Sequence, residues 1–403
     1  MNTKVLISGA GIAGPALAHW LGRYGFETTV VERAPALRGG GQNVDFRGRT
    51  HLTVLERMGL LDELRALDTG GSPITFVDPD GRRLLHLPAE FASGAVELPR
   101  GELARLLHRH SSARAEYVFG DSITALAEHA NGVRVEFRHG APRDVDLVIG
   151  ADGLHSTVRR LAFGPEQHYV RHLGYYAATW HLPNDGTLPA TGSVGLNVPG
   201  RLASLGADHR DPGRAGAFCL FASPARAYDR NDPEQQKALI RQAFAGLGWR
   251  VPELLASLDT APELYFDAIS RADLPAWSTG RIALLGDAAC GATIGGMGTG
   301  TGVVAAYVLA GELARAGGDH RTAFARYERL LRDYARGCQK GGDRTGPFLA
   351  PRTATGLRLR NGLLNRRWVL RRMLALGEQV SSVELPDYER EPGLSAAGFS
   401  AAG

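Results

Sequence analysis

A glycine-rich turn near the N-terminus has the residue types and spacing that suit a bound pyrophosphate. Gly9, Gly11 and Gly14 stand between an apolar strand and a helical pattern, and a second apolar strand ends at Glu32. Glycine here allows a tight turn and a close approach of backbone amides to phosphate oxygens at a helix start. The acid is placed to accept hydrogen bonds from ribose hydroxyls. The complete unit therefore predicts a dinucleotide with a free 2'-hydroxyl, FAD or NAD, and disfavours NADP at this site.

Two later segments place carboxylates directly after buried strands. Asp152 and Gly153 follow one apolar strand, and Gly286 and Asp287 follow another. A carboxylate at a strand end can hold a ribityl hydroxyl. The glycine-dense loop at residues 291–302 can turn backbone N–H groups toward an anion or a carbonyl oxygen. Both segments are therefore candidates for further contacts with a cofactor.

The elements that position these residues predict an α/β fold. The first thirty residues read as strand, turn, helix and strand, and a buried strand precedes each of the two later carboxylates. Residues 171–224 change to strand-like runs divided by proline and glycine, which predicts a separate β-rich lobe. Long helical tracts are expected at residues 302–336 and 357–377.

The composition bears on the class of protein. The 403 residues are 44% apolar and 22% charged, which is typical of a folded globular chain. Lysine and arginine number 46 against 42 acids, so the net charge of +4 is too small for a dedicated nucleic-acid-binding protein. Cys219, Cys290 and Cys338 form no C-x-x-C pair and indicate neither a disulfide framework nor a metal site. No apolar run predicts a signal peptide or a membrane span, so we expect a cytoplasmic protein.

Taken in order, three motifs resemble the fingerprints of single-component FAD-dependent aromatic hydroxylases of the p-hydroxybenzoate hydroxylase type. They are Gly9-x-Gly11-x-x-Gly14, Asp152-Gly153-x-x-Ser156-x-x-Arg159 and Gly286-Asp287-Ala288-Ala289. The resemblance covers roughly residues 1–335. Within that family the sequence is most similar to the branch that contains the tetracycline-inactivating monooxygenases.

The resemblance implies a fold as well as a function. We expect a doubly wound, Rossmann-like FAD-binding domain of discontinuous segments, a β-sheet substrate lobe and a C-terminal bridging helix. The expected boundaries are 1–165 and 271–335 for the FAD-binding domain, with a small strand insertion at about 72–98, 166–270 for the substrate lobe, 336–380 for the C-terminal helical segment and 386–403 for a disordered tail.

The resemblance also assigns roles to residues. In that family the glycine turn and the acid at the position of Glu32 bind the ADP part of FAD, and the acid at Asp287 binds the ribityl chain. Arg100 matches a further FAD contact and Asp45 an acid at the flavin. Arg38 matches a basic residue that meets the pyridine nucleotide. The full set of expected cofactor contacts is Gly9, Gly11, Gly14, Glu32, Arg33, Arg38, Asp45, Arg100, Asp152, Gly286, Asp287, Gly296 and Gly298. Tyr176, Thr179 and Phe218 are expected to face the substrate. No catalytic acid or base is assigned.

In the resembled family, NADPH or NADH reduces FAD, and O2 adds at C4a to give a hydroperoxyflavin that hydroxylates an aromatic compound. We therefore expect a phenolic or polycyclic, natural-product-like substrate. The sequence has no second G-x-G-x-x-G, which predicts a pyridine nucleotide that docks transiently. The chain is expected to be a monomer or a weak homo-oligomer.

One departure from the family keeps other flavin reactions open. The third motif usually carries a proline a few residues after Gly-Asp-Ala-Ala, but residues 290–295 contain none. Baeyer–Villiger oxygenation, oxidation and a flavin-binding scaffold without turnover remain alternatives. A halogenase is disfavoured because no Trp-x-Trp occurs. A hydrolase is disfavoured because Asp152, His155 and Ser156 are too close in sequence to form a triad relay.

Two further features have a functional and a structural interpretation. Residues 344–377 hold eight arginines and no acid among apolar residues, so they could face a membrane or an acidic substrate. We favour a helix that braces two lobes, with its arginines paired to acids elsewhere. Cys290 could be a redox thiol, but a small buried thiol that only packs is the favoured interpretation.

Overall fold

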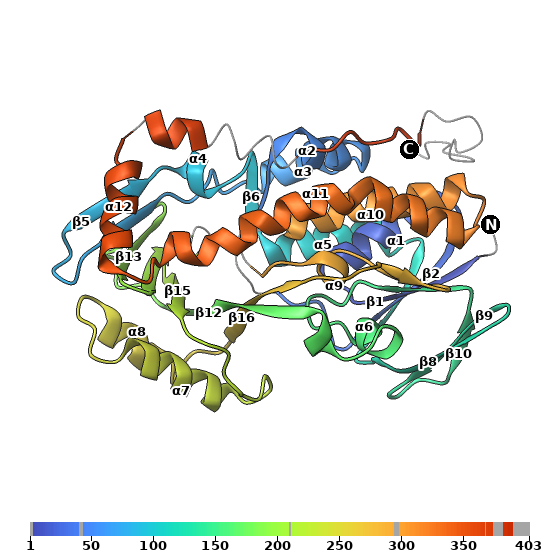
Figure 1. The fold of residues 1–403 in the computed structure, drawn as a ribbon, viewed down its shortest axis with the longest axis horizontal. Helices are drawn as coiled ribbons and strands as arrows, with labels where there is room; N and C mark the ends of the chain where they lie inside the picture. Colours follow the sequence, from blue (N-terminus) through green and yellow to red (C-terminus); the bar gives the residue numbers. More distant parts are fainter. Residues whose placement is uncertain are drawn as a thin grey trace.

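The computed structural model describes residues 3–39, 43–208, 211–293, 298–366, 368–373 and 382–389. A parallel sheet covered by helices occupies one end of the molecule and a larger mixed sheet the other, and one long helix runs along both (Figure 1). This arrangement confirms the predicted α/β fold class with a separate β-rich lobe.

A six-stranded sheet brings the three predicted motifs to one edge. Its strands are β1 (Lys4–Ser8), β2 (Glu27–Glu32), β7 (Ala115–Phe119), β11 (Leu147–Gly150), β17 (Ser278–Thr279) and β18 (Ile282–Leu284). They run in the order β17-β18-β11-β1-β2-β7, and all neighbours are parallel except β17 and β18. Ile7 pairs with Ile149, which pairs with Ala283. The carboxyl ends of β1, β11 and β18 therefore lie side by side, each followed by one motif.

Different layers cover the two faces of this sheet (Figure 1). The helices on one face are α1 (Ala13–Arg23), α5 (Arg100–Ser111) and α10 (Gly298–Arg315). The other face carries α6 (Thr157–Ala162) and an antiparallel sheet of β8 (Ile123–His129), β9 (Gly132–Phe137) and β10 (Arg143–Val145). This sheet replaces most of the helical layer expected for a doubly wound domain. Its buried residues Val133 and Val135 alternate with exposed ones, which suits a strand.

The larger sheet has seven strands. They are β4 (Ile74–Val77), β5 (Arg83–Leu87), β12 (Val170–Pro183), β13 (Ser193–Val198), β14 (Arg201–Ala207), β15 (Arg214–Ala222) and β16 (Leu264–Ala272), in the order β16-β12-β15-β14-β13-β4-β5. We call this sheet, with α7 (Pro233–Phe244) and α8 (Val251–Ser257) on one face, the β lobe. The insertion at 72–98 was expected to belong to the FAD-binding domain. Its strands β4 and β5 instead belong to the β lobe, because β4 pairs in parallel with β13.

The remaining elements are short. They are β3 (Asn43–Phe46), which pairs with β6 (Val96–Pro99), the helices α2 (Gly48–Arg57), α3 (Leu61–Ala66), α4 (Ala89–Ala92), α9 (Asp287–Cys290) and α12 (Ala354–Leu364), and the 3-10 helix η1 (Glu166–His168). Helical residues 368–373 follow α12.

The helical tract predicted at 302–336 is two helices. α10 ends at Arg315 and α11 (His320–Leu349) begins after Gly317 and Gly318, whose φ values of 60° and 89° favour glycine and end the first helix. The Asp319 side chain then accepts hydrogen bonds from two backbone amides at the start of α11. α11 contacts α9 and α10 at one end and β12, β15 and β16 at the other. The bridging helix is therefore α11, and the boundary expected at 335/336 falls inside it.

The disordered tail expected from residue 386 is wrong for its first residues. Tyr388 is completely buried in the core of the FAD-binding part, and the Pro386 carbonyl accepts hydrogen bonds from Arg57 and Tyr307. Residues 390–403 lie outside the described residues. Within the described part of the chain, no helix combines the length and the apolarity needed to cross a membrane.

Candidate functional site

A cavity of about 480 Å³ opens where the carboxyl ends of β1, β11 and β18 meet the β lobe. The glycine turn, the end of β2, the start of α5, the turns after β11 and β18, and β16 all contribute to its walls. The predicted cofactor residues that line it are Gly9, Gly11, Glu32, Arg33, Arg38, Arg100, Asp152, Asp287 and Gly298.

The glycine turn is shaped by close backbone packing. Gly9 has a φ of 107°, and a Cβ atom on Gly14 would lie 1.9 Å from the Gly9 carbonyl oxygen. Gly14 therefore serves the packing of α1 on β1 and does not line the cavity. A Cβ atom on Gly11 would meet only the Arg100 Nη2 atom, at 3.5 Å. Gly11 thus leaves space on the cavity side, as a close approach to phosphate requires.

Backbone amides fix the Glu32 carboxylate at the end of β2. Its Oε2 atom accepts a hydrogen bond from the Ala10 amide and its Oε1 atom one from the Ala34 amide, both at 2.9 Å. The carboxylate is held in one orientation at the cavity wall. Arg33 and Arg38, which follow it, are exposed at the rim.

The Asp152 carboxylate supports its own turn. It accepts hydrogen bonds from the Ser8 and Ser156 hydroxyls and, at 2.8 and 3.2 Å, from the Thr157 and Val158 amides. Burial raises the pKa of Asp152, and these hydrogen bonds oppose the shift. Asp152 therefore lines the cavity mainly as the support of the β11 turn and of the start of α6.

A buried arginine joins the second and third motifs. Arg159 is fully buried, and its Nη1 atom donates to the Ala288 carbonyl oxygen at 2.9 Å. Its Nη2 atom donates to the Leu154 carbonyl oxygen. The turn after β11 and the turn after β18 are thus held together by one guanidinium.

The Asp287 carboxylate has the environment expected of a ligand for hydroxyl groups. Burial raises the pKa of Asp287, and the nearby Arg100 guanidinium opposes the shift. Among the described residues, none donates a hydrogen bond to its side-chain oxygens. A Cβ atom on Gly298 would lie 2.8 Å from its Oδ1 atom, so glycine keeps the space beside the carboxylate open. A ribityl hydroxyl of FAD would supply the missing donor.

Two other predicted cofactor residues do not line the cavity, and a third lies outside the described residues. Gly286 has a φ of 60° and packs between α1 and α10, so its role is in the turn. The Asp45 carboxylate pairs with the Arg47 guanidinium on the same segment. Gly296 lies outside the described residues.

The predicted substrate residues lie on two different faces of the β lobe. Thr179 and Phe218 are paired across β12 and β15 and share one face. Tyr176 is on the other face, where its ring stacks on Phe221 and Phe266 at centroid distances of 5.5 and 5.4 Å, beneath α7. Tyr176 is therefore a core residue and its substrate assignment is wrong. Thr179 and Phe218 do not line the cavity either.

Tyr265 on β16 was not predicted, and it projects into the cavity. It is 44% exposed although the pKa of its phenol is raised by burial and, secondarily, by the Asp267 carboxylate. The Tyr265 ring is exposed because the cavity is open to solvent. Arg100 and Asp287 lie close enough to change the pKa of its phenol. Tyr265 is thus the aromatic side chain that the β lobe presents to the cofactor residues.

A histidine in the second motif connects the cavity to the β lobe. His155 Nδ1 lies 3.0 Å from Glu166 Oε2, and Glu166 also pairs with Arg230 at 3.1 Å. Burial would lower the pKa of His155, but the hydrogen bonds to Asp267 and Glu166 outweigh it and raise the pKa. At Glu166, burial would raise the pKa, but the contacts with His155 and Arg230 outweigh it and lower the pKa to about 2. The carboxylates on the two sides of His155 therefore favour its protonated form.

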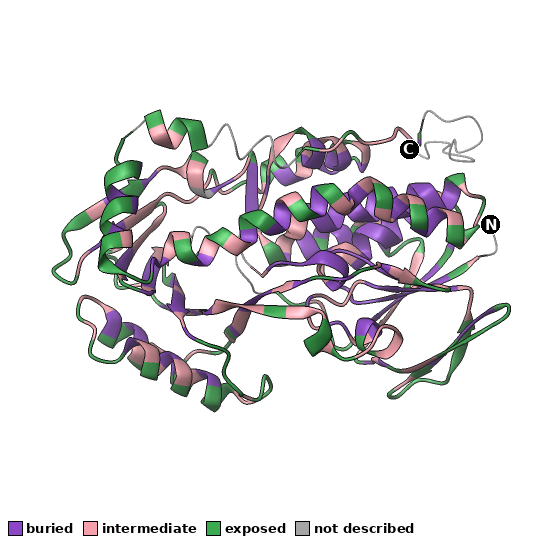
Figure 2. Cartoon of the chain, in the orientation of Figure 1, coloured by how far each residue is buried: buried purple, intermediate pink, exposed green. Residues whose placement is uncertain are grey.

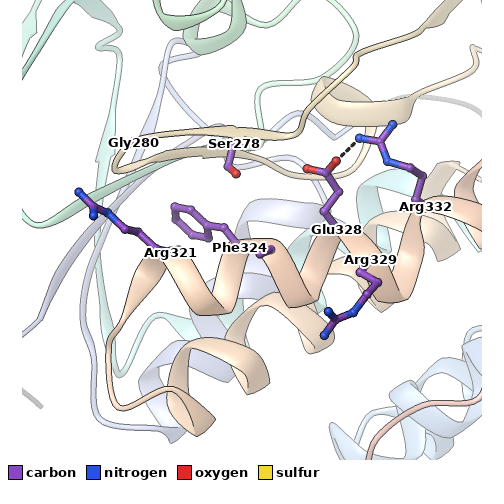
Figure 3. Close-up of a pocket in the computed structure, with 8 residues that line it drawn as sticks. Ser278, Gly280, Arg321, Phe324, Glu328, Arg329 and Arg332 are labelled. Atoms are coloured by element: carbon purple, nitrogen blue, oxygen red, sulfur yellow. Dashed lines mark hydrogen bonds and ion pairs between the residues drawn. The ribbon is translucent and has the colours of Figure 1, made fainter.

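A second hollow, of about 560 Å³, lies beside α11 and the β17–β18 turn (Figure 3). Phe324 lines it, and Glu328 forms an ion pair with Arg332 on the same helix. The Glu328 carboxylate also accepts a hydrogen bond from the Trp277 backbone amide at 2.8 Å. The hollow adjoins the amino end of β18, whereas the cofactor motif follows the carboxyl end. It is therefore not part of the cavity described above.

Similar proteins agree with this geometry. Residues 2–172 match the family described as FAD binding domain. A flavin-dependent monooxygenase of Legionella longbeachae is 36% identical over 347 residues, which cover 85% of this chain and 88% of that protein. The chain belongs to the flavin-dependent monooxygenases. Two solved structures are similar to this monooxygenase over 96% of its chain. Tetracycline destructase Tet(55) is 34% identical, with 99% of its own chain covered and a TM-score of 0.82. Tetracycline destructase Tet(51) is 30% identical, with 100% of its own chain covered and a TM-score of 0.83.

The family makes FAD the cofactor of this monooxygenase, and the residues at the cavity fit it. The open space at Gly11 suits a pyrophosphate, Glu32 suits a ribose, and the carboxylate of Asp287 lacks the donor that a ribityl hydroxyl provides. Sequence reasoning missed His155 and Tyr265. His155 stood inside a recognised motif, whereas nothing near Tyr265 in the sequence distinguishes it from other strand residues.

Proposed function

We propose that this monooxygenase takes electrons from NADPH or NADH and uses O2 to hydroxylate a phenolic or polycyclic aromatic compound. The observation that carries the proposal is the continuity of one cavity. It extends from Glu32 past Asp287 to Tyr265 on the β lobe. Leu264 also lines this end beside Tyr265, so an aromatic compound finds an apolar and an aromatic partner next to the cofactor residues.

FAD supplies the redox and oxygen chemistry when it is bound. The chain's own contribution is to hold and enclose it. The glycine turn would face the pyrophosphate, Glu32 the ribose and Asp287 the ribityl chain, while the Arg100 guanidinium would balance negative charge on the cofactor. The protein then has to orient an aromatic carbon and limit water, which needs shape more than an acid or a base.

Two observations support transient docking of the pyridine nucleotide. In the described residues, one parallel sheet carries a glycine turn of this kind, and FAD takes that turn. Arg33 and Arg38 are exposed at the cavity rim, where guanidinium groups can meet the phosphates of a second nucleotide. We assign the encounter with NADPH or NADH to this rim.

The substrate class rests on the two similar destructase structures and on the shape of the cavity end. Tetracycline, which gives those enzymes their name, is a polycyclic compound, and their sequence identity of 30% and 34% with this chain extends over nearly its full length. A polycyclic or phenolic substrate also matches the exposed aromatic ring of Tyr265.

The decisive experiment measures nicotinamide oxidation by the purified, FAD-loaded protein with a panel of phenols and polycyclic ketones. We expect one compound to stimulate oxidation and to gain one oxygen atom from 18O2. Insertion of oxygen beside a ketone would establish Baeyer–Villiger chemistry instead. Hydrogen peroxide without a labelled product would establish an oxidase. Tight FAD binding with no stimulated oxidation by either nucleotide would favour the scaffold and contradict the proposal.

A further inference from the structure

The most exposed apolar side chains of the protein are concentrated at one place. In the described part of the chain, five large apolar side chains stand out as exposed, and one of them, Tyr265, lies in the FAD cavity. The other four are Leu359, Leu363, Trp368 and Met373, within fifteen residues of one another. Figure 2 shows this part of the chain, α12 and the helical residues after it, largely exposed at one end of the molecule.

α12 has a buried side that explains its position on the β lobe. Leu357 and Leu364 are buried there, and the Arg360 guanidinium lies 4.8 Å from the centre of the Phe76 ring. Arg360 also donates a hydrogen bond to the Leu349 carbonyl oxygen. This side of the helix holds α12 on the β lobe, whereas the bracing of two lobes that the sequence favoured is carried out by α11.

The outer side of α12 does not take part in bracing. Leu359 and Leu363 are 62% and 43% exposed, and residues four apart lie on the same side of a helix. Trp368, in the next helical segment, is 65% exposed. Two leucines and an indole therefore form an apolar ridge that no described residue covers.

Arginines accompany this ridge. Arg358, Arg366, Arg371 and Arg372 are exposed, and no described acid forms an ion pair with them. The sequence has no aspartate or glutamate between Asp343 and Glu378. We expected the arginines of this segment to pair with acids elsewhere in the chain. Four of them form no such pair among the described residues and are exposed to solvent. We call Leu359, Leu363, Trp368, Met373 and these four arginines the basic ridge.

We propose that the basic ridge binds an anionic lipid surface. An indole and two leucines can enter the interface between headgroups and acyl chains while guanidinium groups contact lipid phosphates. A second copy of the chain fits poorly, because its own four arginines would face these four. A protein partner is less favoured because the ridge contributes to neither of the two cavities described. The proposal does not depend on the identity of the substrate.

The test is sedimentation of the full-length, FAD-loaded protein with two kinds of vesicle, one of phosphatidylcholine alone and one with a third of phosphatidylglycerol. We expect the protein to sediment with the anionic vesicles and to be released by salt, because the attraction to lipid phosphates is screened. The Trp368 emission should shift to shorter wavelength in the bound state, and a Trp368→Phe variant should lack the shift.

A charge-matched pair of double variants separates the ridge from net charge. Arg371→Gln/Arg372→Gln should lower the vesicle partition coefficient by about 25-fold, since each arginine near an anionic surface contributes about fivefold. Arg321→Gln/Arg329→Gln removes the same charge from exposed positions on α11 and should leave the coefficient unchanged. Leu359→Ser/Trp368→Ser removes the apolar contacts and should abolish binding, while FAD absorbance and melting temperature report that the variants fold.

Three results would overturn the proposal. The first is equal sedimentation with neutral and anionic vesicles. The second is equal loss of binding in the two arginine double variants. The third is a dimer in sedimentation velocity that the Trp368→Ser change dissociates, which would assign the ridge to a second copy. Failure of vesicle binding with intact substrate turnover would leave the proposed function unaffected.

Discussion

His155 Nε2 lies 3.1 Å from Asp267 Oδ2, so the turn that follows β11 is tied to the edge strand β16 of the β lobe. On the other side of the ring, Nδ1 contacts Glu166. The two halves of the cavity, one from the FAD-binding part and one from the β lobe, therefore meet at the His155 imidazole, whose protonated form the two carboxylates favour. This contact makes their association dependent on pH.

The first prediction concerns stability as a function of pH. The pKa of His155 is raised above its usual 6.5, so its contribution is complete below pH 6.5 and is lost as the pH rises through the raised value. The pKa of Glu166 is lowered from 4.5 to about 2, so its contribution is complete above pH 4.5 and is lost as the pH falls toward 2. Both are complete between pH 4.5 and 6.5.

His155→Gln removes the cation and keeps a polar side chain of similar reach. We expect the variant to be less stable than the parent by about 1–3 kcal/mol at pH 6, with a smaller difference at alkaline pH. Urea unfolding at a series of pH values measures this difference. His139→Gln, which changes an exposed histidine elsewhere, is the control. A stability difference that does not change with pH would show that His155 acts by packing alone.

The second prediction concerns the unpartnered carboxylate of Asp287. Asp287→Asn replaces a half-buried carboxylate, whose pKa is raised by desolvation, with a neutral amide, so the protein without FAD should be as stable as the parent or more stable. FAD affinity should fall by about 10- to 150-fold, because a charged acceptor contributes about 1.5–3 kcal/mol to a hydrogen bond. Flavin fluorescence quenching and melting temperature measure the two effects. A parallel loss of both would indicate that Asp287 is structural.

The third prediction compares two glycines of the same turn. Gly14→Ala places a Cβ atom 1.9 Å from the Gly9 carbonyl oxygen, so the backbone must move and stability should fall by at least about 1–3 kcal/mol. Gly11→Ala meets only the end of the Arg100 side chain, at 3.5 Å, and should leave the FAD-free protein intact while weakening FAD binding. Equal effects of the two changes on the melting temperature of the FAD-free protein would contradict these separate roles.

Local signals in the sequence predicted most of the cofactor side of the cavity. Gly11 and Asp287 each follow the end of a buried strand by three residues, Glu32 is the last residue of another strand, and parallel pairing then brings these ends together. The contact of His155 with Asp267 joins residues 112 positions apart, and neither residue has a neighbour that indicates the other. Such a contact depends on how the β lobe is placed against the parallel sheet.

The substrate assignment failed for a different reason. Side chains alternate between the two faces of a strand, so the aromatic residues of β12 could be placed on alternate faces but not on a particular one. The core beneath α7 takes Tyr176, and the opposite face takes Thr179. The break between α10 and α11 was missed because a glycine can also lie within a helix. Only the positive φ values of Gly317 and Gly318 show that the chain turns there.

The fourth prediction concerns Tyr265, the aromatic side chain inside the cavity. Tyr265→Ala should lower kcat/KM for the aromatic substrate by about tenfold, because loss of an aromatic contact costs about 0.5–1.5 kcal/mol beyond the lost area. FAD affinity should change little, since Glu32 and Asp287 remain. Tyr265→Phe keeps the ring and should retain most of the activity. If phenylalanine were as damaging as alanine, the hydroxyl group and not the ring would be the important feature.

The fifth prediction concerns the C-terminal segment at residues 382–389. The Tyr388 hydroxyl donates to Glu312 Oε1 at 2.8 Å, and Glu312 is completely buried with Arg315 3.1 Å from the same oxygen. Tyr388→Phe removes a donor from a buried carboxylate, so the free energy of unfolding should fall by about 1.5–3 kcal/mol. Tyr117→Phe removes a half-buried hydroxyl whose partner is the neutral Ser111, and it should cost only about 0.5–1.5 kcal/mol. Urea unfolding of both variants measures the difference, and equal losses would show that the Glu312 charge does not depend on this segment.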